Sequence, residues 1–230
     1  MSDIPEQPEK SAADVAYGVV KAAVSAVPVA GGPAAEVLGL IFGPPLEKRR
    51  EKWLEQLAGA VKEVQEKVSE LTPEKLSQNE AFVSTALRAT EIAVRTHQQE
   101  KLQALRNAVV SAALPNAPDD TLQQIFLNHV DTLTPWHIRI LAFFDDPKDW
   151  GRRHNITYPT WTMGSPSVVL EQSMRELAGR GGFYNQIVSD LEQRGLMAGG
   201  GLHTTMTAHG MFSSRTTPLG KQFLQFIGRK

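Results

Sequence analysis

The residues that could carry out chemistry are scattered along this chain and form none of the motifs that usually hold a catalytic group. The six histidines lack the spacing of zinc ligands; they are His97, His129, His137, His154, His203 and His209. Ser165 and Ser167 lie in the segment GSPSV, which lacks the Gly-x-Ser-x-Gly turn of an exposed nucleophilic serine. We therefore expect a protein that is not an enzyme.

Sites for a phosphate, a cofactor or a metal are equally hard to place. No Walker-type or dinucleotide-binding glycine pattern is present, and we interpret Gly199-Gly200-Gly201 as flexible backbone. Asp145, Asp146 and Asp149 form an acidic cluster, which is typical of a solvated turn and has a cation site as its alternative. We expect neither a cofactor nor a metal.

Composition places the chain among ordinary soluble proteins. It has 230 residues, 41% hydrophobic and 21% charged, and its net charge of −1 creates no general attraction to nucleic acid or anionic lipid. The absence of cysteine excludes disulfides and thiolate chemistry and is typical of a reducing compartment. The start MSDIPEQPEK is not a secretory signal, so we predict a disordered tail over residues 1–11 and a cytoplasmic location, with peripheral attachment to an inner membrane as the open alternative.

The longest element that the sequence predicts is one helix over Asn79–Leu114, which contains neither proline nor glycine. Its inward positions alternate in steps of four and three; they are Val83, Leu87, Thr90, Val94, His97, Lys101, Ala104, Ala108 and Ala112. The polar run Arg95–Lys101 interrupts this pattern. We interpret His97 and Lys101 either as a solvated gap or as a polar contact inside a bundle or toward a partner.

A second long helix is predicted over residues 46–71, after Pro44-Pro45. Its apolar positions follow a heptad pattern; they are Leu54, Leu57, Val61, Val64, Val68 and Leu71. Thr72-Pro73 ends it, and Ser77 or Asn79 is expected to cap the next helix. Because the connection is short, we predict an antiparallel pair of long helices in a helical domain over residues 12–114, with Val64 and Val68 buried between them.

An apolar leader over residues 12–45 precedes these helices. Pro28 and Gly31-Gly32-Pro33 divide it into two short helices, each too short to span a membrane. One interpretation is a cap on the core, and the other is a hairpin that enters a bilayer. The candidate membrane segment has its largest apolar residues at Val20, Val24, Val27, Leu38, Leu40 and Ile41.

The second half is predicted to be a separate domain over residues 121–230, after a linker at 115–120. We expect short helices over residues 121–131, 136–146, 167–177, 183–194 and 219–228, and a loop over 148–165. Glycine and threonine content predicts a β-hairpin between residues 202–208 and 211–216, with its turn at His209-Gly210. The fold class is therefore mainly α with one small β-hairpin.

Three segments of this half resemble MarR-type bacterial winged-helix domains: LTPWHIRILAFF, VSDLEQRGLM and SRTTPLGKQFLQFI. The resemblance implies a winged helix in which the helix at 183–194 contacts a partner or the major groove of DNA. Asp190 and Glu192 would repel phosphate, which argues against DNA. The candidate contact residues are Tyr184, Asn185, Gln186, Arg194 and Arg215.

The first half resembles bacterial proteins associated with phage defence and the apolar leaders of HeLo-like domains, through VVKAAVSAVPVAGGPAAEVLGLIFG and the charged helix after it. We therefore expect an intracellular bacterial protein that acts through protein–protein contacts, with another protein or a second copy as partner. Membrane association through residues 12–45 and a role in phage defence are implied by the resemblance. The alternative is a winged-helix transcriptional regulator that binds DNA.

Overall fold

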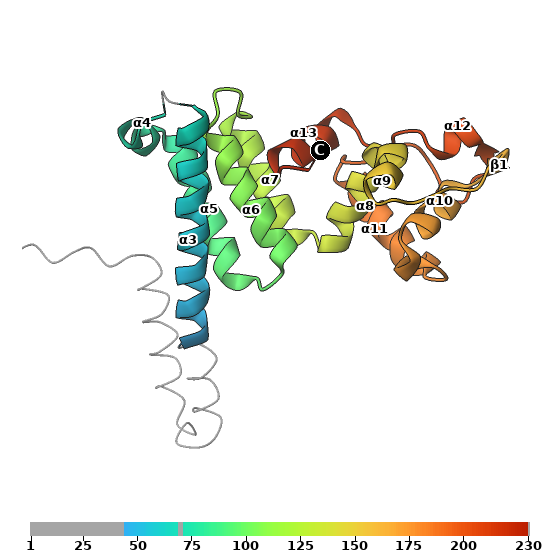
Figure 1. Cartoon of the computed structure of the whole chain (residues 1–230), viewed down its shortest axis with the longest axis horizontal. Helices are drawn as coiled ribbons and strands as arrows, with labels where there is room; N and C mark the ends of the chain where they lie inside the picture. The colour runs from blue at the N-terminus through green and yellow to red at the C-terminus, as the bar shows by residue number, and fades with distance from the viewer. Residues whose placement is uncertain (1–43, 69–70, 230) are drawn as a thin grey trace, which may run out of the picture. The chain divides into compact units, whose positions relative to one another are not determined.

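The computed structural model describes residues 44–68 and 71–229, and within them the fold is mainly α with one two-stranded antiparallel sheet (Figure 1). The chain divides into two compact units, Met1–Lys52 and Trp53–Lys230. The predicted tail over residues 1–11 and the candidate membrane residues of the leader lie outside the described residues; the latter are Val20, Val24, Val27, Leu38, Leu40 and Ile41. Among the residues described, no helix combines the length and the apolar character needed to cross a bilayer.

Helix α3 (Pro44–Lys67) presents a different face to the core from the one that the heptad pattern predicts. Trp53, Ala60 and Val64 are buried, and the Trp53 indole N–H donates to Thr90 Oγ1 at 2.9 Å. Leu54, which the heptad placed inward, is 44% exposed. The predicted burial of Val64 is confirmed, whereas Val68 is only half-buried. The large Trp53 ring sets the register because it removes more apolar area from water than Leu54 would.

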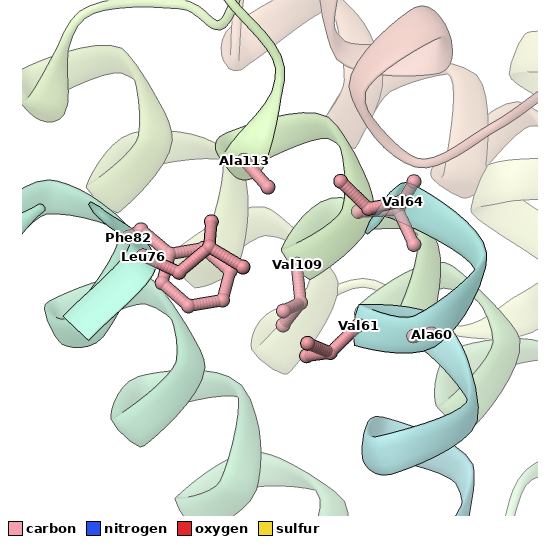
Figure 2. Close-up of a pocket in the computed structure, with 8 residues that line it drawn as sticks. Ala60, Val61, Val64, Leu76, Phe82, Val109 and Ala113 are labelled. Carbon is pink, nitrogen blue, oxygen red and sulfur yellow. The ribbon is translucent and has the colours of Figure 1, made fainter. Parts of the chain in front are cut away.

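Val64 lies in an apolar pocket where four helices meet (Figure 2). The pocket is closed by aliphatic side chains and one phenyl ring, and its lining has no polar side chain; it is lined by Ala60, Val61, Val64, Leu76, Phe82, Val109, Val110 and Ala113. Figure 2 shows Val61 and Val64 of α3 opposite Val109 and Ala113, with Leu76 and Phe82 beside them. Burial of this apolar surface attaches α3 to the helices that follow.

The prediction of one continuous helix over Asn79–Leu114 is wrong. The segment forms two helices, α5 (Glu80–Arg95) and α6 (Gln99–Ala113), which pack against each other as an antiparallel hairpin. The chain reverses at Thr96–Gln98, where the Gln98 backbone N–H donates to Thr96 Oγ1 at 3.2 Å. The turn therefore falls within the polar run that interrupted the pattern, and its His97 side chain remains in water.

The two helices of this hairpin approach closely through small residues. Ala89 and Ala93 of α5 and Ala104 and Ala108 of α6 are each no more than 2% exposed. The predicted inward positions are correct for α6 but not for α5, where Leu87 is 64% exposed. Reversal of the chain at residues 96–98 explains the difference, because the two helices share no common register.

Helix α5 begins with the cap that the sequence predicted. Asn79 Oδ1 accepts from the Phe82 backbone N–H at 3.1 Å, after a short helix α4 (Pro73–Gln78) that the sequence analysis missed. We expect Asn79→Ala to lower the free energy of unfolding by about 1 kcal/mol, because it leaves that N–H without its partner. Urea denaturation measures this change, and Asn79→Asp, which keeps the acceptor oxygen, should restore most of the loss.

Helices α7 (Asp120–Thr132) and α13 (Pro218–Phe226) pack on the α5–α6 hairpin. The Phe126 ring contacts Phe223 and Phe226 with centroids 5.6 and 5.5 Å apart. The Asn107 amide donates to Ile227 O at 3.0 Å, which ties α6 to the end of α13. The predicted linker at residues 115–120 thus joins segments that pack together within one unit.

The remaining elements are short: α8 (Pro135–Asp145), α9 (Pro147–Arg153), α10 (Pro166–Ser173), a 3-10 helix (Arg175–Leu177), α11 (Gly181–Gln193) and α12 (Ala208–Met211). Helix α9 begins what the sequence predicted as a loop. Strand β1 (Met163–Gly164) pairs antiparallel with β2 (Met206–Thr207), and Met197 bridges Thr216.

The predicted hairpin between residues 202–208 and 211–216 is wrong. Its first strand pairs with β1 instead, and its predicted turn at His209-Gly210 lies inside α12. The Thr207 hydroxyl accepts from the Gly210 N–H at 3.3 Å and so caps a helix where the sequence analysis placed a turn.

Candidate partner-binding face

Four side chains, two from α8 and two from the start of α11, where Arg180 is the N-cap, form a stacked row that we call the arginine–aromatic row: Arg139, Trp136, Phe183 and Arg180. The Arg180 guanidinium lies 4.2 Å from the Phe183 ring centroid. The Phe183 and Trp136 rings meet edge to face with centroids 6.1 Å apart, and the Arg139 guanidinium lies 5.2 Å from the Trp136 ring. The sequence produces this row because each arginine stands one turn from its aromatic residue, at the start of a helix.

The row is accessible and carries excess positive charge. Trp136 and Phe183 are both half-buried, and Arg180 is exposed. Arg139 pairs with Glu100, to which its Nε donates at 2.7 Å. In the described chain, neither Arg180 nor the neighbouring exposed Arg175 has a carboxylate within ion-pair distance. A ligand on this face would therefore meet aromatic edges next to the unpaired Arg180.

Buried polar groups hold the two helices of the row in place. His137 Nδ1 accepts from the Thr134 backbone N–H at 3.2 Å, so its neutral form carries the proton on Nε2, which lies 3.3 Å from Asp190 Oδ2. The other oxygen of Asp190 accepts from the Gln186 amide at 2.7 Å. Asp190 therefore contacts His137 of α8 with one oxygen and Gln186 of its own helix with the other. The second contact orients Gln186 beside the row.

A second histidine lies nearby, at the junction of α7 and α11. His129 is 7% exposed, and the Arg194 guanidinium lies 3.5 Å from its Nδ1. Burial lowers the pKa of His129, and Arg194 lowers it further. Burial also lowers the pKa of His137, against the opposing effect of Asp190. Both rings are therefore neutral in the folded protein at neutral pH.

This arrangement predicts acid sensitivity. Both pKa values lie below that of an unfolded histidine, about 6.5, so the unfolded chain binds more protons as the pH falls below that value. The contribution to stability is complete above about pH 6.5 and is lost as the pH falls through the folded pKa values. We expect urea denaturation to show that stability declines as the pH falls below about 6.5, and His129→Gln to flatten that decline; an unchanged slope would contradict the assignment to His129.

The residues that the sequence proposed as contacts divide into two groups. Asn185 and Gln186 are exposed, Arg194 is half-buried, and Asn185 Oδ1 lies 3.0 Å from His203 Nε2. Tyr184 and Arg215 are buried, so their prediction as outward contacts is wrong. The Tyr184 hydroxyl donates to Glu171 at 2.8 Å, and burial together with Glu171 raises its pKa to about 12. Tyr184 faces inward because it lies one helical turn before Ile187 and Val188, on the same buried face of α11.

The two polar candidates of the long-helix prediction separate in the structure. His97 is exposed in the turn between α5 and α6. Lys101 is 8% exposed, and its ammonium donates to Asp131 O at 2.7 Å, close to the end of α7. Burial lowers the pKa of Lys101, although Asp131 opposes this. Lys101 thus satisfies a carbonyl that a helix end leaves without a partner.

Trp136 and the arginines of the row were not selected from the sequence. Phe183 is one of several apolar residues in its predicted helix, and Trp136 follows Pro135 at a helix start, where an anchoring role is equally expected. The available signal was the spacing: arginine three residues after Trp136 and three residues before Phe183. That spacing becomes informative once α8 and α11 are known to be neighbours.

Two residues of the acidic cluster, Asp146 and Asp149, stabilise helix α9. Asp146 accepts from the Asp149 N–H at 2.9 Å as the cap of α9, and Asp149 pairs with Arg152 and Arg153. Asp145 Oδ1 is buried without a hydrogen-bond partner, and burial raises the pKa of Asp145. Across the described residues, no three histidine, aspartate or glutamate side chains are grouped as metal ligands would be.

Comparison of the chain with protein-family models, with curated proteins and with solved structures returned no match.

Proposed function

We propose that this protein is a non-catalytic interaction module that binds an acidic protein surface through the arginine–aromatic row. The observation that carries this proposal is the stack of two half-buried aromatic rings between two arginines, with Arg180 and Arg175 free of carboxylate partners in the described chain. Tryptophan and arginine dominate the residues that contribute most to protein–protein affinity. Unpaired cations at the rim favour an acidic partner and accelerate the encounter.

The finer assignment of the second half as a winged helix also belongs to this proposal. The order α8, β1, α10, α11, followed by the Met197–Thr216 bridge and α13, supports it. In this assignment α11 is the helix that a DNA-binding relative would insert into the major groove. Winged helices serve both DNA and protein partners, so the surface residues decide between them.

The alternative function, DNA binding, rests on the exposed amides of Asn185 and Gln186, which could read base edges. Their contacts favour the protein partner. Gln186 is held by Asp190 and Asn185 by His203, and Glu192 adds a negative charge on the exposed side of α11. Membrane association through residues 12–45 and a role in phage defence depend on residues outside the described part and stay predictions.

We expect no sequence-specific binding of duplex DNA by the full chain. Binding at low salt would carry no information, because phosphate contacts alone produce it. Selection from genomic fragments at physiological salt should return no enriched motif. One enriched motif that disappears in the Asn185→Ala, Gln186→Ala double variant would establish the alternative.

Site-specific photo-crosslinking in the source cells tests the protein partner. A photoreactive residue at Gln186, one turn from Phe183 on α11, should crosslink to one particular protein. The matched control is Gln103, an exposed residue of α6. The proposal requires that the crosslinked protein, once purified, also bind the purified chain. The proposal would be contradicted if this protein did not bind, or if it crosslinked equally often to Gln103.

A further inference from the structure

Arg215 is a buried cation without an anionic partner. It is 7% exposed, and no carboxylate of the described chain lies within ion-pair distance of its guanidinium. Its Nη1 donates to Gly199 O at 2.6 Å, with Gly200 O at 3.4 Å. Its Nη2 has only the Met206 sulfur, at 3.4 Å, and its buried Nε has no hydrogen-bond partner. A thioether is a weak acceptor, so one edge of the guanidinium is nearly unsatisfied.

That edge is the one with which arginine binds oxyanions. Nε and Nη2 present two parallel N–H groups that match two oxygens of a phosphate or a carboxylate. Burial lowers the pKa of Arg215, opposed only by the more distant charge of Glu192. A buried unpaired donor is rare in folded proteins and calls for an explanation such as an ion.

The loop whose carbonyls accept from Arg215 Nη1 also carries backbone N–H donors. Gly199 and Gly200 have φ angles of +129° and +75°, and a Cβ on Gly199 would lie 3.2 Å from Arg215 Nη1. Only glycine permits both the backbone conformation and this close approach. The loop is tied down at Ala198, whose N–H donates to Arg215 O, and at Gly201, whose carbonyl accepts from Thr204 N–H. Within the described chain, the N–H groups of Gly199, Gly200 and Gly201 have no acceptor.

We propose that Arg215 and the Gly199–Gly201 loop bind a phosphate-type oxyanion, which occupies the Nε–Nη2 edge when the Met206 side chain moves aside. Phosphate fits this donor set better than a carboxylate, because it has oxygens for the loop N–H groups as well as for the guanidinium. Methionine suits the role of a displaceable cover, since it is unbranched and adopts many conformations. This site is independent of the arginine–aromatic row.

The test is an NMR titration of the full-length protein with inorganic phosphate, in parallel with acetate and with chloride at equal ionic strength. We expect the Arg215 Nε–H and the Gly199–Gly201 amide signals to shift saturably with phosphate and to respond more weakly to acetate. Stronger saturation by acetate would overturn the choice of ligand. Equal shifts with all three salts would show screening alone and would overturn the proposal, as would the absence of any shift.

Variants separate the site from the fold. Arg215→Lys keeps the charge but loses the paired Nε–H and Nη2–H donors, so it should weaken phosphate binding about tenfold or more. Arg194→Lys, at the C-cap of α11, should leave phosphate binding unchanged. Gly201→Pro removes one N–H without changing Arg215 and should also weaken binding, so the proposal remains testable if Arg215→Lys fails to fold. Met206→Leu removes the sulfur contact, and we expect it to bind phosphate as tightly as the parent or more tightly. Loss of phosphate binding in Met206→Leu would contradict the proposal. Undiminished phosphate binding in Arg215→Lys would also contradict it.

Discussion

Val64→Asp should destabilise the protein by about 3–5 kcal/mol, enough to unfold a marginally stable domain. Val64 is 1% exposed in a pocket whose lining has no polar side chain, so an ionised carboxylate there would lose its hydration without gaining a partner. Urea denaturation followed by circular dichroism measures the change. We expect the urea concentration at which half of the variant is unfolded to fall well below that of the parent.

Leu54→Asp is the matched control on the same helix. Leu54 is 44% exposed, so the same substitution should change stability by no more than about 0.5 kcal/mol. The heptad pattern of the sequence predicts the opposite for Leu54, because it places both residues in the seam. Equal destabilisation by the two substitutions would support the heptad register and contradict the register that Trp53 sets.

Phe183→Ala should weaken binding of the crosslinked partner by about 2 kcal/mol, or roughly thirtyfold, with little loss of stability. Because Phe183 is only half-buried, its loss should cost little stability. Its ring contacts both Trp136 and Arg180 within the row, so its loss should reduce binding. Its removal takes away one of the two rings of the row, with its contacts to Trp136 and Arg180. Isothermal titration calorimetry with purified partner gives the dissociation constants.

Two further variants distinguish a loss of the row's contacts with the partner from an effect that any substitution on α11 would have. Arg180→Glu reverses the charge at the rim and should mainly slow association, with an effect that weakens as salt is added. Gln193→Ala, on an exposed part of the last turn of α11, should leave affinity unchanged. A Phe183→Ala variant that binds as tightly as the parent would remove the row from the interface.

The helices were largely predictable from the sequence, because caps and breakers are local signals. Asn79, Thr134-Pro135 and Thr217-Pro218 mark helix starts where the structure has them. The failure at Asn79–Leu114 has a physical reason. Thr96–Gln98 contains neither glycine nor proline, and the chain turns there because the two alanine-rich faces gain more by packing on each other than a single extended helix gains from propensity.

The candidate site was less predictable, since it depends on which helices are neighbours. The predicted exposure of Asn185 and Gln186 is confirmed, whereas Tyr184 shares the buried face of Ile187 and Val188. The Arg215 site depends on a loop that returns to the core, and the strand pairing of β1 with β2 joins segments over forty residues apart. Such nonlocal pairing leaves little trace in a single sequence.

Hydrogen exchange of the chain, free and saturated with purified partner, tests the central claim most directly. The amides of Trp136, Gly181 and Gly182 lie in the first turns of α8 and α11 and have no acceptor in the described chain, so they should exchange quickly in the free protein. The account predicts that the partner slows them strongly, while Thr121, in the equivalent position of α7, is unaffected. Protection of Thr121 instead, or unchanged exchange at Trp136, Gly181 and Gly182, would contradict binding through the arginine–aromatic row.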